Sequence, residues 1–195
     1  MQEKIATLRG LRAAAAGQPA PPLAERRAAF DARGDQYPLP GDAVVTEVDA
    51  GGVPAHWITV PGADAGRVLL YLHGGGYQVG SFRSHAELAS RLGRASGRPV
   101  LLPEYRLAPE HPFPAAVEDA LAVWRWLRSV PRLSASALAV AGDSAKSAAA
   151  AGVDVTVQAG EGLPHVYPAM PGIPEAAEAT GQAGAFLRDT AGQAG

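Results

Sequence analysis

The feature that most restricts how this sequence can fold is a short apolar run, Val68 to Leu72, which is followed at once by His73-Gly74-Gly75-Gly76. Hydrophobic residues at every position, rather than at alternate positions, indicate a strand buried on both faces, as in a parallel sheet covered by helices. Three glycines after such a strand allow the backbone to turn tightly and bring its N–H groups close to a ligand. The run therefore predicts an α/β domain with a ligand-binding turn at one strand end.

Predicted strands and helices alternate along most of the chain. The first 40 residues contain two stretches with helical spacing of hydrophobic residues, and Gly51-Gly52 then separates two β-rich segments that predict a hairpin. The predicted strands are 44–48, 57–60, 67–72, 99–102, 137–141 and 153–158, and the predicted helices are 2–16, 22–33, 84–96, 113–127 and 175–188. In helix 113–127 the bulky side chains are Val117, Leu121, Trp124 and Trp126. Residues 146–151 form at most two helical turns. This alternation predicts a mostly parallel sheet with helices on both faces.

Composition and charge exclude several other classes. The 195 residues are 47% hydrophobic and 18% charged, which is typical of a globular protein, and the length suits one domain, 1–195. Without cysteine there is no disulfide framework, thiolate metal site or cysteine nucleophile. A net charge of −2 gives no basic surface for nucleic acid or anionic lipid. No apolar run approaches the roughly 18 residues of a membrane span, and residues 1–17 lack the apolar core of a signal segment. We expect a cytoplasmic protein.

Two further segments contain candidate catalytic residues. Gly142-Asp143-Ser144-Ala145 follows a predicted buried strand, and a serine on a sharp strand-to-helix turn exposes its hydroxyl as a nucleophile. The alternative is an ordinary Ser or Asp at a helix N-cap. His165 lies in the loop 160–174 after the last predicted strand, where it is a candidate base for the serine.

The glycine turn allows more than one interpretation. Its N–H groups suit an oxyanion formed in acyl transfer, and the alternative is a glycine-rich turn without chemistry. A dinucleotide site is disfavoured, because Val79 stands where a third glycine is needed and no acidic residue follows at the ribose position.

The other histidines have no predicted catalytic role. His73 is interpreted as a structural part of the glycine turn, and His111 is expected to pack or to form a hydrogen bond within the Pro109–Pro114 segment. His56 is placed on a strand and His85 near a helix start. No group of His, Asp and Glu has metal-ligand spacing, so we expect neither a metal nor a cofactor.

Together these segments resemble the hormone-sensitive-lipase family of α/β-hydrolases, the bacterial family IV carboxylesterases. The resemblance is carried by the glycine turn, by the run from Tyr105 to Ala116 (YRLAPEHPFPAA) and by Gly142-Asp143-Ser144-Ala145. It implies that Ser144 attacks an ester carbonyl, that His165 relays the proton, and that the N–H groups of Gly74, Gly75 and Ala145 hold the oxyanion. It also implies a helical cap in residues 1–40, the N-terminal half of the sheet in 41–145 and a shortened C-terminal piece in 146–195.

Two departures from the family pattern matter. Lys146 stands where the family has a glycine, and only 20 residues separate Ser144 from His165, where the family has a much longer segment that includes the catalytic acid. Neither Asp154 nor Glu161 matches that acid. An internal deletion joined within residues 143–148 is one hypothesis for the short gap.

Two functional hypotheses follow from the sequence. The first is a serine hydrolase of short, uncharged carboxylic esters, which acts through an acyl-enzyme on a small-molecule ester. The second is a non-catalytic remnant of such an esterase, which only binds or self-associates. In either case an exposed sheet edge makes a homo-oligomer possible.

Overall fold

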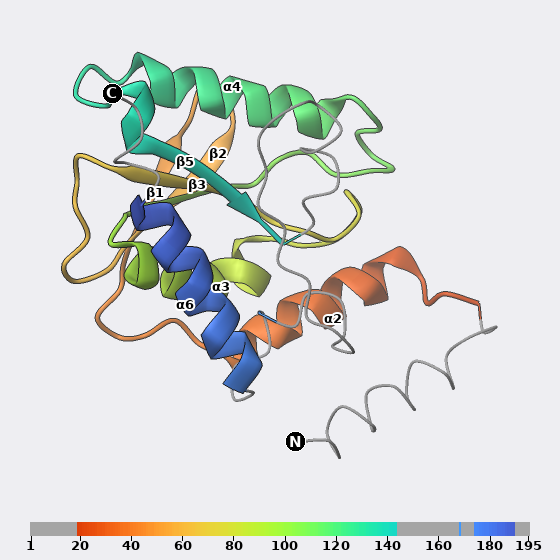
Figure 1. The fold of residues 1–195 in the computed structure, drawn as a ribbon. Coiled ribbons are helices and arrows are strands. Elements are labelled where there is room, and N and C mark those ends of the chain that lie inside the picture. The colour runs from red at the N-terminus through yellow and green to blue at the C-terminus, as the bar shows by residue number, and fades with distance from the viewer. Residues whose placement is uncertain (1–18, 144–167, 169–173, 190–195) are drawn as a thin grey trace.

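The computed structural model describes residues 19–143, 168 and 174–189, and in this part of the chain five strands form one mixed sheet (Figure 1). The strands are β1 (Val44–Asp49), β2 (Pro54–Thr59), β3 (Val68–Leu72), β4 (Val100–Pro103) and β5 (Leu138–Gly142), in the spatial order β1-β2-β4-β3-β5. The predicted hairpin is confirmed as the antiparallel pair β1–β2. β2 is antiparallel to β4, whereas β3 runs parallel to both β4 and β5.

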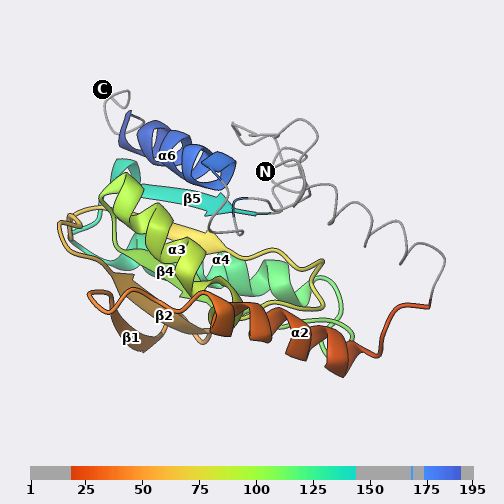
Figure 2. The same ribbon diagram turned by 90° about the horizontal axis from the view of Figure 1, so that it is seen from below.

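Helices cover both faces of this sheet, as the alternation predicted. The helices are α2 (Leu23–Gln36), α3 (Phe82–Ser96), α4 (Ala115–Ser129) and α6 (Pro174–Asp189), and a 3-10 turn, Ala135–Ala137, precedes β5. α3 and α6 lie side by side on one face, α4 lies on the other, and α2 packs beside α3 (Figures 1 and 2). No helix in the described ranges is long and apolar enough to cross a membrane.

β3 is buried on both faces because each of its alternating sides meets a helical layer. Leu69 and Tyr71 belong to the cluster under α3 and α6, and Val68 and Leu70 belong to the cluster under α4. A strand covered in this way has no solvent-facing side, which explains the unbroken apolar run in the sequence.

α4 presents a different face to the sheet from the one that we predicted. Its buried residues are Ala115, Asp119, Val123 and Leu127, spaced four apart. Val117 and Leu121, predicted to supply bulk to the core, are 39% and 45% exposed. Asp119 accepts hydrogen bonds from the backbone and the guanidinium of Arg106, and this contact fixes which side of α4 faces inward. Trp124 and Trp126 pack only at the margin of the cluster.

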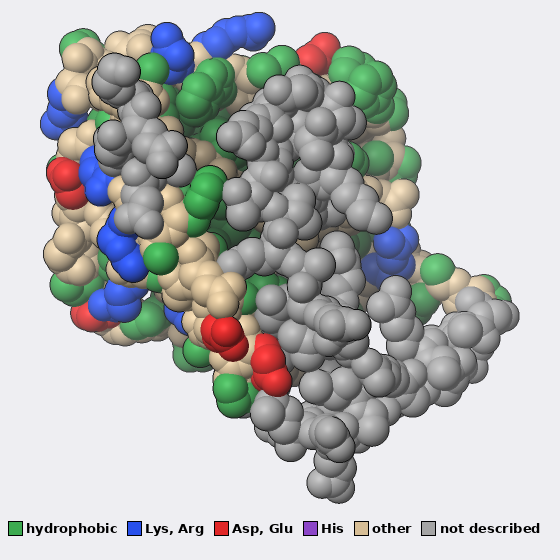
Figure 3. All heavy atoms as spheres, viewed as in Figure 1, with side chains coloured by type: hydrophobic (Ala, Val, Ile, Leu, Met, Phe, Trp, Pro, Cys, Tyr) green, Lys and Arg blue, Asp and Glu red, His purple; other side chains and the backbone are tan. Residues whose placement is uncertain are grey.

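The strand predicted as buried at 137–141 forms β5, but it lies at the edge of the described sheet and is only partly buried. Val140 is 51% exposed, because the cluster under α4 is built mainly from β3, β4 and the hairpin and includes only Leu138 of β5. Hydrophobic side chains also reach the surface along α4 (Figure 3). The predicted helix 2–16, the run 146–151 and the predicted strand 153–158 lie outside the described residues.

Arg98 is almost fully buried in the connection between α3 and β4, and it joins this connection to α6 and to the 3-10 turn before β5. Its guanidinium donates to the carbonyl of Ala137 at 2.7 Å and to that of Leu187, near the end of α6, at 2.8 Å. Burial lowers the pKa of Arg98 to about 10. Arg67, half-buried, donates to the carbonyls of Leu187 and Arg188. Two cations thus meet the negative end of the α6 dipole, where they are stabilising.

We predict that Arg98→Met lowers the free energy of unfolding by about 2 kcal/mol, since two buried carbonyls lose charged donors. Arg67→Met should cost less, because Arg67 is less buried and its hydrogen bonds are longer. Urea unfolding followed by circular dichroism measures both variants. An equal loss in the two variants would contradict the role given to burial.

Candidate functional site

The register between β3 and β5 brings the two sequence motifs that follow these strands together at the carboxyl ends of the strands. Leu72 lies opposite Gly142 in this parallel pair. The chain therefore leaves both strands at the same end: His73 begins the glycine turn beside the point where Asp143 follows β5. Residues about 70 positions apart in sequence become neighbours in this way, and the backbone N–H of Gly74 donates to Asp143 Oδ1. Ser144, Ala145 and His165 lie outside the described residues.

The carboxylate of Asp143 is a buried hydrogen-bond acceptor for three segments. Besides Gly74, it accepts the hydroxyl of Tyr71 at 2.9 Å, and His85 Nε2 lies 3.4 Å from its Oδ2. The Asp143 side chain is only 6% exposed. Burial by itself raises the pKa of Asp143. The hydrogen bond and electrostatic attraction of His85, together with the hydrogen bonds from Gly74 and Tyr71, outweigh burial, and the net pKa is below the ordinary value. Asp143 is thus a carboxylate held by donors.

The first two glycines of the turn are required for different reasons. A Cβ on Gly74 would lie 2.5 Å from Asp143 Oδ2, so no larger residue fits beneath that carboxylate. Gly75 has φ +125°, which L side chains rarely adopt, and a Cβ there would overlap the carbonyl oxygen of Val79. The turn closes through that same pair of residues, since the Val79 N–H donates to the Gly75 carbonyl at 3.2 Å.

The N–H groups of the turn differ in their availability. The N–H of Gly74, predicted as an oxyanion donor, is engaged by Asp143. Among the described residues, the N–H groups of Gly75 and Gly76 have no hydrogen-bond acceptor. An oxyanion at this turn would compete with the Asp143 carboxylate for Gly74 but not for the next two glycines.

His73 is buried and held by its neighbours, which agrees with the structural role expected for it. Its Nδ1 lies 2.8 Å from the Gly74 carbonyl. The Tyr105 hydroxyl donates to the His73 carbonyl, and the two rings stack with centroids 4.2 Å apart. On its other side His73 stacks on His85 at 5.0 Å. Burial lowers the pKa of His73 to about 4, so the ring is neutral at pH 7.

The run from Tyr105 to Ala116 supports the turn from outside. Tyr105 holds His73, and Arg106 binds Asp119 of α4. Glu110 forms a bidentate ion pair with Arg27 of α2, both contacts at 2.7 Å. The run therefore links α2, the glycine turn and α4.

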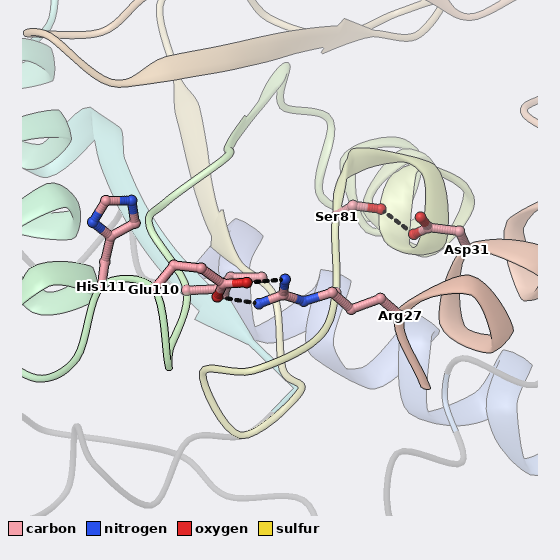
Figure 4. Close-up of a pocket in the computed structure, with 7 residues that line it drawn as sticks. Arg27, Asp31, Ser81, Glu110 and His111 are labelled. Atoms are coloured by element: carbon pink, nitrogen blue, oxygen red, sulfur yellow. Dashed lines mark hydrogen bonds and ion pairs between the residues drawn. The ribbon is translucent and has the colours of Figure 1, made fainter. Parts of the chain in front are cut away.

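An open pocket of about 420 Å³ lies between α2 and this run (Figure 4). Arg27 reaches across to Glu110, and Asp31 accepts a 2.6 Å hydrogen bond from Ser81 at the start of α3. These polar contacts place α2 beside residues that directly follow the glycine turn. The cap predicted for residues 1–40 is described only from residue 19, so its cover over an acyl pocket stays a prediction.

The remaining histidines lie close to where the sequence placed them. His56 is on β2 and stacks on Phe82, and His85 is buried in the first turn of α3. His111 was expected to pack or to form a hydrogen bond; it is exposed rather than packed, and its backbone N–H donates to the Leu107 carbonyl. Within 19–143, 168 and 174–189, no three His, Asp or Glu side chains gather where they could hold a metal.

Sequence reasoning missed the contribution of Tyr71, His85 and Asp143. One signal was available: Tyr71 is the only residue with a polar group in the apolar run of β3. A tyrosine buried in a strand needs a partner for its hydroxyl, and an acidic residue after a neighbouring strand is a suitable one. Nothing in the spacing of His85 pointed to the same carboxylate.

Comparison with known proteins adds to this geometry. Residues 69–146 match the alpha/beta hydrolase fold family. An acetyl-hydrolase of Streptomyces hygroscopicus is 44% identical over 144 residues, or 71% of this chain and 46% of the relative. An ethyl acetate hydrolase of Pseudomonas putida is 41% identical over 126 residues, or 62% of this chain and 40% of the relative. The crystal structure of an esterase from the bacterial hormone-sensitive lipase family matches with a TM-score of 0.65 and 40% identity, over 73% of this chain and 48% of that one.

The fold and the matched segment define an α/β-hydrolase. Within this class the chain is similar in sequence to the two hydrolases named above, and in structure to an esterase of the bacterial hormone-sensitive lipase family. The chain spans less than half of the length of each of the three proteins named above.

Alanine substitutions should rank the three glycines by stability. Gly76→Ala, with φ +61° and open space around it, should cost roughly 1–2 kcal/mol of unfolding free energy. Gly74→Ala displaces the Asp143 carboxylate and should cost about 1–3 kcal/mol. Gly75→Ala combines an unfavourable φ with an overlap on a backbone oxygen and should cost the most. Chemical unfolding of the three variants measures the order; a Gly75→Ala protein as stable as the wild type would contradict this geometry.

The buried His73 should make stability depend on pH. Its pKa is about 4 in the folded chain against an ordinary 6.5, so the unfolded chain binds the proton first. The free energy of unfolding should therefore fall by up to roughly 3 kcal/mol as the pH decreases from about 6.5 to 4. Urea unfolding at several pH values should show a flatter profile for His73→Phe. His111→Phe, at an exposed position, should keep the wild-type slope, and an equal change in both variants would reject this assignment.

Proposed function

We propose that this chain is a serine carboxylic-ester hydrolase that acts through an acyl-enzyme. Ser144 is the nucleophile and His165 the general base. Ser144 Oγ bonds to the ester carbonyl carbon while His165 accepts its proton. The bond to the alcohol oxygen then breaks as His165 returns the proton to the leaving alcohol. Water repeats both steps to release the acid and regenerate Ser144.

One observation supports this proposal more than any other. The pairing of Leu72 with Gly142 places the glycine turn beside the residue that precedes Ser144. A nucleophile and a set of oxyanion donors must lie within a few ångströms of one carbonyl group, and adjacent ends of parallel strands provide that proximity. The Gly74–Asp143 hydrogen bond links the two segments directly.

The oxyanion donors are assigned according to what their N–H groups already contact. Gly75 keeps its predicted role together with Ala145. Gly76 is added, because its N–H has no acceptor among the described residues. Gly74 becomes a secondary donor, because Asp143 already accepts its N–H.

Short, uncharged acyl esters are the proposed substrate class. The relatives named acetyl-hydrolase and ethyl acetate hydrolase support a small acyl group by their names. Besides the small-molecule ester no partner is proposed, and a cytoplasmic location stays a prediction from the sequence.

A second candidate function rests on the length of the chain. Only 20 residues lie between Ser144 and His165, and the chain spans 46% of one relative and 40% of another. A catalytic acid for His165 is not identified in the sequence. The alternative is therefore a non-catalytic remnant that binds or self-associates, for which β5, with its half-exposed Val140, offers a sheet edge.

An ester assay separates the two candidates. With p-nitrophenyl acetate and p-nitrophenyl butyrate, the wild-type chain should turn over at least about 100-fold faster than Ser144→Ala, since removal of the nucleophile costs more than absence of the acid. Ser136→Ala, at an exposed serine, should match the wild type. An organophosphonate probe should add its mass to the wild type but not to Ser144→Ala. Turnover of the wild type that does not exceed Ser144→Ala, together with no labelling, supports the non-catalytic alternative.

A further inference from the structure

The Asp143 cluster, defined as Tyr71, Gly74, His85 and Asp143, connects three parts of the molecule through one buried carboxylate. Tyr71 comes from β3, Gly74 from the glycine turn and His85 from α3. Burying a carboxylate is costly unless donors surround it, and here a hydroxyl, an amide and an imidazole do so. The serine mechanism leaves Asp143 and His85 without a chemical role, so their contact requires a separate explanation.

The orientation of His85 is determined from both sides of its ring. Its Nδ1 lies 2.9 Å from the Ser84 hydroxyl and 3.4 Å from the Ser81 carbonyl, at the N-terminal cap of α3. These contacts direct Nε2 toward Asp143 Oδ2 at 3.4 Å. The ring also stacks on His73, the first residue of the glycine turn. The start of α3 thus sets the position of the imidazole, and the imidazole faces one oxygen of the carboxylate.

The other carboxylate oxygen sets the position of the turn. Oδ1 accepts the Gly74 N–H, and a hydrogen bond to an ionised acceptor is shorter and stronger than a neutral one. Because Gly74 has no side chain, this bond and the contact beneath the carboxylate orient its peptide group. The peptides of Gly75 and Gly76 follow directly, so their N–H directions depend on the same bond.

We propose that His85 and Asp143 are positioning residues of the ester-hydrolysis site. His85 orients the Asp143 carboxylate, and the carboxylate holds Gly74 so that the next N–H groups of the turn face the carbonyl oxygen of the reacting ester. The proposal rests on the proposed function, because it takes the glycine turn as the oxyanion site. Neither residue touches the reacting atoms.

Two His85 variants separate positioning from bulk packing. His85→Gln keeps a side-chain amide donor near the place of Nε2, whereas His85→Leu keeps a similar volume without a donor. Asp143→Asn removes the charge that binds Gly74. Arg98→Met is the matched control, because it removes a buried charge at the opposite end of β5.

The first measurement is steady-state kinetics at pH 7.5 on the full chain. Misplacement of oxyanion donors by about 1 Å lowers the rate roughly 100-fold, so His85→Leu and Asp143→Asn should lose about 100-fold in kcat with KM changed less than about 3-fold. His85→Gln should recover at least about tenfold of that loss. Arg98→Met should lose stability but keep the wild-type kcat.

The second measurement is the amide resonance of Gly74 in a chain labelled with ¹⁵N-glycine. A charge-assisted hydrogen bond shifts the amide proton downfield. The Gly74 signal should therefore move upfield in Asp143→Asn and His85→Leu, return toward the wild-type position in His85→Gln, and stay unchanged in Arg98→Met. If Asp143→Asn does not fold, the two His85 variants carry the comparison.

Failure of this proposal and failure of the proposed function give different results in these experiments. The proposal is overturned if His85→Leu keeps wild-type kcat, if His85→Gln is as impaired as His85→Leu, or if the Gly74 resonance stays in place. If the wild type shows neither turnover nor phosphonate labelling, the proposed function fails, and the Gly74 resonance alone decides the positioning: a shift in His85→Leu but not in Arg98→Met supports it, and no shift rejects it.

Discussion

The parallel pairing of β3 with β5, in which Leu72 lies opposite Gly142, is the constraint on which the rest of the site depends. It determines that the glycine turn and the residues after β5 leave the sheet side by side, at the carboxyl ends of the two strands. The hydrogen bond from Gly74 to Asp143 is possible only in this register, because a shift by one residue would turn the side chains of β5 to the opposite face.

The polar groups buried at the carboxyl ends of these strands form hydrogen bonds with one another. Asp143 is surrounded by donors, and His73 stays neutral between two aromatic neighbours. Tyr105 ties the turn to the segment that also contacts α2 and α4. Because each of these groups depends on the next, the glycine turn is held from several sides although its three glycines have no side chains. Such pre-organisation of N–H groups is what stabilisation of an oxyanion requires.

Local patterns predicted most of the described elements because each one reports a local physical requirement. The apolar run of β3, the glycine pair between β1 and β2 and the helical spacing in α3 were sufficient for strand, hairpin and helix. The predictions that failed concern orientation toward the rest of the molecule. The inner face of α4 is set by the contact of Asp119 with Arg106, and the exposure of β5 follows from its place at the sheet edge. The hydrophobic periodicity within a segment predicts neither the inner face of α4 nor the exposure of β5.

The sequence by itself determined the class of the protein and the motifs that carry its proposed chemistry, because these depend on short runs of neighbouring residues. It showed three glycines after a buried strand and a serine after another. Only the tertiary structure decided that Gly74 is already bonded to Asp143 and that His85, from the start of α3, faces the same carboxylate. Those contacts join residues separated by 69 positions in the first case and by a comparable distance along the chain in the second. They arise from strand order and helix packing, which no local pattern specifies.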